Sequence, residues 1–163
     1  MVTFKQLFVP TDFGESAERA LDVALALASK FDAKVTLFHS SWLPASAHVA
    51  YGEGLPWPTD AFMQQAEKEL DAVTAHAKER FSNVESYVVK GEPWEEILRG
   101  ARERGADLIV MGSHGRRGLS RVFLGSVAER IVRLSPIPVL TISSKTEQDA
   151  KDKALSHAST AKP

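Results

Sequence analysis

A single segment, residues 107–134, constrains most strongly what this chain can fold into; its sequence is DLIVMGSHGRRGLSRVFLGSVAERIVRL. The apolar run Leu108–Met111 has the length and composition of a strand that is buried on both faces of a sheet. A glycine-rich loop follows, and the pattern Ser126-Val-Ala-Glu129 then predicts a capping box at the start of an amphipathic helix. A buried strand followed by a loop and a helix is typical of an α/β protein with a parallel sheet.

The loop in this segment also predicts a binding site for an anion such as a phosphate. It carries four glycines, at Gly112, Gly115, Gly118 and Gly125. Glycines let the backbone approach a ligand, and the amides and the dipole at a helix N-terminus attract negative charge. The alternative is that the glycines serve turn geometry alone and that Ser126 simply caps the helix. Arg116 and Arg117 offer charge-assisted contacts, although adjacent loop residues rarely both face one ligand.

The rest of the chain alternates between strand and helix patterns. Strands are predicted at Leu7–Val9, Lys34–His39, Glu85–Val89, Leu108–Met111 and Val139–Ser143. Helices are predicted from a capping Ser16 to about Lys30, along the apolar stripe from Met63 to Ala77, from Pro93 to Gly105, and from Ser126 to about Leu134. This order predicts a single α/β domain with a doubly wound, five-stranded parallel sheet and helices on both faces.

Two segments lack such patterns. Residues 40–59 are rich in proline and glycine and are predicted to form a long loop, either a mobile cover over a site or a disordered stretch. The tail at 145–163 is small and polar, which predicts disorder, so the domain is expected to span 1–144.

Composition narrows the possible functions. The chain has 163 residues and a net charge of −1, so no basic excess suggests nucleic acid, and any anion site must be local. Cysteine is absent, which excludes disulfides, thiolate metal sites and cysteine nucleophiles. The chain contains no run of about 18 apolar residues, so no membrane span is expected. Its first residues, MVTFKQLFVP, do not resemble a signal peptide. A cytoplasmic protein is therefore expected.

The glycine spacing resembles a known motif. Gly112, Gly115, Gly125 and Ser126 fill every fixed position of G-x2-G-x9-G-[S/T], the glycine motif of the ATP-binding universal stress proteins. The resemblance extends over about residues 3–143 and includes V-P-T-D-F, H-S, G-E-P-W-E, L-G-S-V-A-E and S-P-I-P-V-L. It implies a Rossmann-like sheet with strand order 3-2-1-4-5.

The resemblance also implies which residues bind the nucleotide. Pro10, Thr11 and Asp12 match the nucleoside end, and the backbone of Ser40 matches a position at the adenine edge. The remaining positions, toward the ribose and the phosphates, are Met111, Gly112, Gly115, Arg116, Gly125, Ser126 and Val127. The implied cofactor is ATP, with Mg as part of the nucleotide complex, and no catalytic residue or protein metal site is assigned.

Several residues have simpler interpretations. Asp12 is a common residue of an Asx turn. A lone loop histidine such as His114 is more often solvated than catalytic, and His39 fits a hydrogen-bonded structural residue. Neither G-x4-G-K-[ST] nor G-x-S-x-G occurs, which argues against a P-loop NTPase and an α/β-hydrolase. The turn PTDFGES is a poor match to the loop with which relatives of this fold cleave ATP to AMP.

Three hypotheses remain. The leading one is an ATP-binding stress-response module with at most slow hydrolysis, acting in binding or signalling. The others are a nucleotide-free stress protein that works through protein partners and a true ATP-using enzyme. The uncharged strand Val139–Ser143 is expected at a sheet edge, where it predicts a homodimer; neither nucleic acid nor a membrane is an expected partner.

Overall fold

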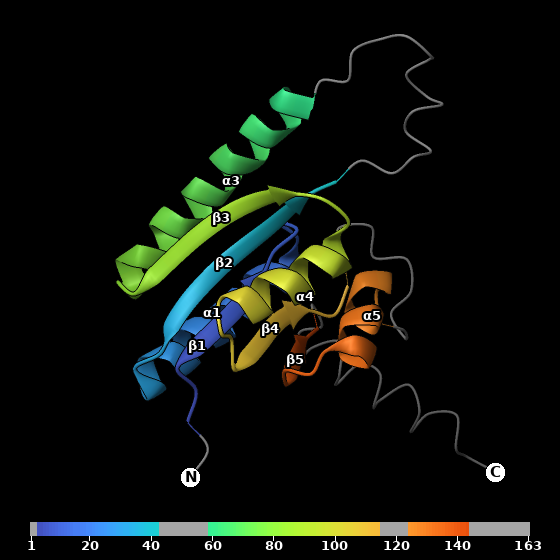
Figure 1. Ribbon diagram of the computed structural model, residues 1–163. Helices are drawn as coiled ribbons and strands as arrows, with labels where there is room; N and C mark the ends of the chain where they lie inside the picture. Colours follow the sequence, from blue (N-terminus) through green and yellow to red (C-terminus); the bar gives the residue numbers. More distant parts are fainter. Residues whose placement is uncertain (1–2, 43–58, 115–123, 144–163) are drawn as a thin grey trace, which may run out of the picture.

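The computed structural model describes residues 3–42, 59–114 and 124–143 and shows a five-stranded parallel sheet with helices on both faces (Figure 1). The strand order is β3-β2-β1-β4-β5, which confirms the predicted fold. The strands are β1 Gln6–Pro10, β2 Lys34–Ser41, β3 Val84–Lys90, β4 Leu108–Gly112 and β5 Val139–Ile142. The helices are α1 Glu15–Phe31, α3 Thr59–Arg80, α4 Pro93–Glu103 and α5 Ser126–Leu134.

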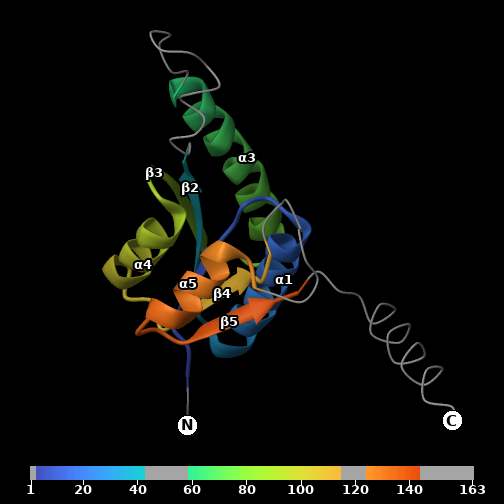
Figure 2. The ribbon, with the colours of Figure 1, turned by 90° about the vertical axis from the view of Figure 1, so that its right-hand side faces the viewer.

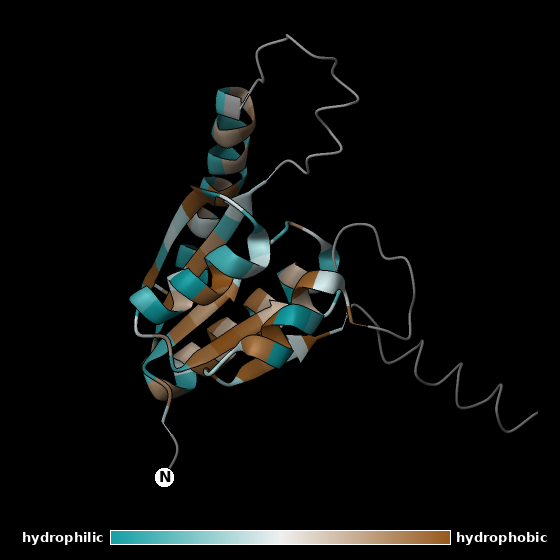
Figure 3. Cartoon of the chain, turned by 45° about the vertical axis from the view of Figure 1, so that its right-hand side comes forward, coloured by the Kyte–Doolittle hydropathy of each residue, from teal (hydrophilic) through white to brown (hydrophobic). Residues whose placement is uncertain are grey.

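The sheet separates two hydrophobic cores, because successive side chains of a strand point to opposite faces. Leu7 and Val9 of β1 pack in one core with α1 and α3, whereas Phe8 packs in the other with α4 and α5. Figure 2 shows the two helix pairs on opposite sides of the strands. Figure 3 shows the apolar residues concentrated along the strands, with polar residues on the outer surfaces of the helices. The strands β1 and β4 are therefore covered on both faces, as predicted for a parallel sheet.

Helix α1 lies against the sheet through small side chains. Ala17, Ala20, Ala24 and Ala28 recur at helical spacing and are all buried. Helix α4 begins with Pro93, as predicted, and Gly105 follows its end with a positive φ of 63°. Strand β2 is two residues longer than predicted, because Ser40 and Ser41 pair with Val89 and Lys90 of β3.

Two predicted helix caps are wrong. Helix α1 has Gly14 as its N-cap and helix α5 has Gly125, and neither cap makes a side-chain hydrogen bond. In each case the glycine takes the extended backbone of an N-cap, so Ser16 and Ser126 lie inside the helix. A hydroxyl caps a helix only from the N-cap position, so Ser126 does not form the predicted capping box with Glu129.

Within the described ranges, no helix combines the length and the apolar composition that crossing a membrane requires.

Candidate functional site

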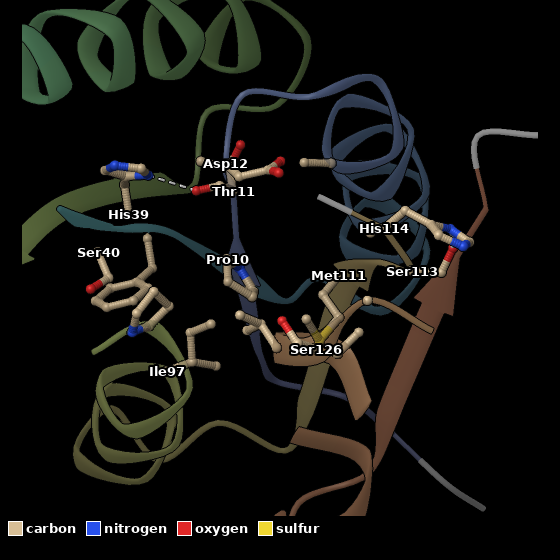
Figure 4. A pocket seen from close by; sticks show the side chains of 17 residues that line it. Pro10, Thr11, Asp12, His39, Ser40, Ile97, Met111, Ser113, His114 and Ser126 are labelled. Atoms are coloured by element: carbon tan, nitrogen blue, oxygen red, sulfur yellow. Dashed lines mark hydrogen bonds between the residues drawn. The ribbon is translucent and has the colours of Figure 1, made fainter. Parts of the chain in front are cut away.

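A cleft of about 200 Å³ opens at the carboxyl ends of β1, β2 and β4 (Figure 4). The sheet order reverses between β1 and β4, and in doubly wound folds the ligand crevice lies at this reversal. The helices α4 and α5 contribute their first turns to the wall, through Pro93 and Ser126. The fold therefore places the cleft where an α/β protein binds its ligand.

Most of the residues predicted to bind a nucleotide lie together along this cleft. Those that line it are Pro10, Thr11, Asp12, Ser40, Met111, Gly112, Gly125, Ser126 and Val127. Gly115 and Arg116 lie outside the described residues. The roles of all these residues toward a ligand remain predictions.

Other residues of the cleft were missed by sequence reasoning. They are Ala17, Phe38, His39, Pro93, Ile97, Ser113, His114 and Ala128. Phe38 and His39 could have been found, because they precede Ser40 on the same strand. Ile97 gives no such signal, since its apolar spacing in α4 predicts only a core residue, and its place in the cleft depends on how α4 packs.

The turn after β1 is held by its own side chains. Asp12 Oδ1 accepts a hydrogen bond from the Gly14 amide (3.0 Å), and Thr11 Oγ1 accepts one from the Phe13 amide (3.0 Å). Phe13 adopts a left-handed backbone with φ of 62°, which is unusual for a bulky residue. The Asx turn considered for Asp12 is therefore present, and it coexists with a position in the cleft wall.

His39 braces this turn from β2. Its Nδ1 lies 2.8 Å from the Thr11 carbonyl oxygen (Figure 4). A carbonyl only accepts, so Nδ1 carries the proton. The His39 ring also packs on the Phe13 ring, with 4.6 Å between centroids. The predicted role of His39 as a hydrogen-bonded structural residue is confirmed.

Gly112 allows β4 and α1 to approach each other closely. A Cβ at this position would lie 2.9 Å from the Ala17 backbone nitrogen, closer than real Cβ atoms come to backbone. The absence of a side chain at Gly112 is therefore required by packing between protein elements, whatever the ligand.

The N-terminus of α5 faces the cleft through Ser126, Val127 and Ala128. The helix itself offers no acceptors to its first amides, and no side chain in the described part of the chain caps them. The Gly125 amide donates to the Ser113 carbonyl (2.7 Å), and the Glu129 amide donates to the Gly125 carbonyl (2.8 Å). The cleft thus contains an uncapped helix N-terminus, which favours negative charge.

His114 differs from the solvated side chain that the sequence suggests. Its Nδ1 lies 2.7 Å from the hydroxyl of the buried Ser113, and its buried Nε2 has no hydrogen-bond partner among the described residues. In Figure 4 this pair lies beside the end of β5, across the site from His39 and Ser40.

Titratable groups with shifted pKa values lie elsewhere. Burial raises the pKa of Glu85, but hydrogen bonds from Lys34 and Thr36 and nearby positive charges outweigh it, so the net shift is downward. Burial raises the pKa of Tyr87, against an opposing effect of Arg104. None of these residues lines the cleft. In the described part of the chain, no cluster of histidine and acidic residues could hold a metal ion.

Comparison with known proteins agrees with this architecture. The model of the universal stress protein family matches residues 3–143. Universal stress protein MJ0577 of Methanocaldococcus jannaschii is 32% identical in an alignment that covers 88% of this chain and 98% of that protein. The solved structure of MJ0577 has a TM-score of 0.77 and 31% identity, covering 89% of this chain and 99% of that one.

Two further solved structures contain nucleotides. A universal stress protein from Archaeoglobus fulgidus in complex with dAMP has a TM-score of 0.62 and 25% identity, covering 87% of this chain and 99% of that one. A universal stress protein in complex with cAMP has a TM-score of 0.57 and 27% identity, covering 88% and 100%. On the match over residues 3–143 and the shared fold, the chain belongs to the universal stress protein family.

Proposed function

We propose that this protein binds an adenine nucleotide, ATP, in the cleft and acts as a stress-response binding or signalling module with at most slow hydrolysis. The nucleoside lies toward Asp12 and Ser40, and the phosphates lie at the N-terminus of α5. The observation that carries the proposal is the uncapped start of α5, with its amides and dipole, in the wall of a cleft at the sheet reversal.

The other end of the cleft suits a flat, partly apolar group such as a base. Phe38, Ile97 and Met111 supply apolar surface for such a group, and the polar groups at Asp12 can orient it by hydrogen bonding. The Ser40 hydroxyl donates to the Gly91 carbonyl (2.5 Å), so its backbone is the expected contact. The relatives solved with dAMP and cAMP carry an adenine and a phosphate, which supports the same ligand class here.

A magnesium ion would arrive with the nucleotide. The described residues offer no carboxylate cluster for a metal, and Asp12 already accepts a hydrogen bond within its turn. The phosphates are therefore the expected ligands of Mg, and the protein contributes the amides of α5.

The first test is direct. Freshly purified protein is denatured, the released small molecules are identified by mass spectrometry, and ATP binding is measured by calorimetry after nucleotide removal. We expect an adenine nucleotide or measurable ATP affinity. Absence of both would leave the nucleotide-free stress protein as the better hypothesis, and sustained turnover would favour an ATP-using enzyme.

A charge placed at Ser126 tests where the phosphates lie. Ser126 is exposed at the first position of α5, where an acidic side chain stabilises a helix. Ser126→Asp should therefore fold well but repel phosphates, lowering ATP affinity by at least about tenfold while adenosine affinity is unchanged. Ser126→Asn has the same shape without the charge and should bind ATP nearly as the wild type does. Unchanged ATP affinity in Ser126→Asp would place the phosphates elsewhere.

We also propose a homodimer that forms through β5. This strand lies at the sheet edge, and its sequence VLTI carries no charge. An uncharged edge strand invites pairing with another chain, and pairing about a two-fold axis closes the edge.

A further inference from the structure

We propose that Ser16 is a positioning residue for the phosphate end of the cleft. Its buried hydroxyl fastens residues 113–114 to α1, and these residues in turn hold the start of α5. The inference rests on the proposed ATP site, because it names a residue through which that site is kept in place.

The hydroxyl of Ser16 makes a contact far along the chain. Ser16 is the second residue of α1 and is 4% exposed. Its Oγ donates to the carbonyl oxygen of His114 at 2.6 Å, across 98 residues of sequence. A serine in the first turn of a helix commonly bonds to nearby backbone, so this contact between elements is informative.

The contacted residues connect directly to the start of α5. The Ser113 carbonyl accepts the Gly125 amide at 2.7 Å, and Gly125 is the N-cap of α5. On the other side, the Ser113 amide donates to the Ile142 carbonyl of β5 at 2.7 Å. Residues 113–114 therefore join α1, β5 and α5, and the only side-chain hydroxyl that joins them to α1 in the described residues is that of Ser16.

The packing beneath this junction leaves little room for adjustment. A Cβ at Gly112 would lie 2.9 Å from the carbonyl carbon of Ser16 as well as from the Ala17 nitrogen. The end of β4 is thus in direct contact with the first turn of α1. Removing the Ser16 hydroxyl leaves the His114 carbonyl without this donor, and residues 113–114 can then move away from α1. That movement carries Gly125 and the first amides of α5 with it.

The effect should be specific to phosphates. Ser16 does not line the cleft, and its hydroxyl donates to His114 at the phosphate end, whereas Asp12 at the nucleoside end is held by the Gly14 amide. A shift at the start of α5 should therefore weaken ATP and leave adenosine bound as before. A purely structural role would change both ligands or neither.

Thr74 supplies a matched control. It is also buried, at 6% exposed, and its hydroxyl donates to the Leu70 carbonyl at 2.6 Å. This bond lies within α3, which contributes no residue to the cleft. Thr74→Val removes a buried hydroxyl of the same kind, so it controls for a general loss of stability.

The experiment compares wild type, Ser16→Ala and Thr74→Val by calorimetry with ATP and with adenosine. In Ser16→Ala we expect ATP affinity to fall about fivefold to tenfold and adenosine affinity to stay within about twofold, as loss of one hydrogen bond predicts. In Thr74→Val both affinities should match the wild type. Equal losses for both ligands in Ser16→Ala, or an unchanged ATP affinity, would overturn the inference.

Amide hydrogen exchange separates this inference from the proposed function. In nucleotide-free protein, Ser16→Ala should speed exchange of the Gly125 amide, which bonds to Ser113, and Thr74→Val should not. Unchanged exchange at Gly125 would refute the anchoring role even if ATP binds. Faster exchange at Gly125 in Ser16→Ala, together with a wild type that binds no nucleotide, would instead refute the ATP site and retain the anchor.

Discussion

Asp12 serves both the turn after β1 and the wall of the cleft. Its Oδ1 accepts the Gly14 amide, while His39 holds the neighbouring Thr11 carbonyl from β2. The turn also keeps Phe13 in a left-handed conformation, so several contacts together maintain a backbone that is costly on its own. Asp12 is thus placed by the surrounding residues before any ligand binds.

We expect Asp12→Ala to weaken ATP and adenosine alike, by roughly 1–3 kcal/mol of binding free energy, because it loses a hydrogen bond at the nucleoside. Asp12→Asn preserves an oxygen for the Gly14 amide and so keeps the turn. It should still lose most of the affinity, since one acceptor oxygen becomes a donor. Calorimetry with both ligands measures this; a loss confined to ATP would indicate a phosphate or metal-linked role instead.

At the scale of single elements, α1 ends in a strained conformation. Asp32 is its C-cap in the left-handed region with φ of 53°, and its amide donates to the Ala28 carbonyl. Asp32→Gly should raise the free energy of unfolding by about 0.5–1 kcal/mol, because glycine adopts this conformation without a side-chain clash. Asp32→Ala removes the same charge but keeps the clash, so it should not be stabilising. Urea denaturation of the two variants decides between relief of strain and loss of charge.

A polar network joins β2, β3 and Arg104, which is the C-cap residue of α4. Glu85 pairs with Lys34 (2.6 Å) and Arg104 (2.9 Å) and accepts the hydroxyl of the buried Thr36 (2.9 Å). Its pKa is below the ordinary value of 4.5, although burial alone would raise it. The stabilisation is therefore fully present above pH 4.5 and is lost as the pH falls through the lowered pKa.

We expect Glu85→Gln to lower the free energy of unfolding by about 1 kcal/mol at pH 7, a small value because solvent screens this half-buried group. The difference from wild type should shrink in acid, as the pH falls below 4.5 and through the lowered pKa of Glu85. Glu67→Gln, an exposed site on α3, should show little difference at neutral or acid pH. A Glu85→Gln deficit that persists unchanged in acid would mean that packing, rather than charge, explains the loss.

At the scale of the whole molecule, β5 is an edge strand of the sheet, and it is the strand through which we propose that two copies pair. The carbonyls of Pro138 and Ile142 accept amides of Ile109 and Ser113, so they face β4. In a parallel strand these groups alternate, so the amide of Thr141 faces outward and that of Leu140 faces β4. A partner strand would therefore pair through Thr141.

We expect Thr141→Pro to give a folded monomer, because proline removes an outward amide donor from the pairing edge. Leu140→Pro breaks the bond to β4 and should destabilise the fold instead. Light scattering after gel filtration, with circular dichroism to check folding, reads both outcomes. If the wild type is a monomer at micromolar concentration, β5 is not a dimer interface.

The sequence alone determined the order of the elements, the parallel sheet and most of the cleft residues. The reason is local: apolar runs mark the strands, and parallel strands bring their carboxyl ends to one edge. Residues at the ends of β1, β2 and β4, such as Asp12, Ser40 and Gly112, therefore meet once the strand order that the family resemblance implies makes these strands neighbours. The spacing of the glycine motif likewise predicted that Gly125 and Ser126 lie at the start of the last helix.

Only the tertiary structure decided what several of these side chains contact. Ser16 and Ser126 both match a helix cap in sequence, yet the N-caps are Gly14 and Gly125, and the Ser16 hydroxyl instead reaches His114. Tertiary packing likewise determines the place of Ile97 in the cleft and the hydrogen bond between His39 and the Thr11 carbonyl. Such contacts join residues distant in sequence, and their existence depends on how helices pack on the sheet, which no local pattern encodes.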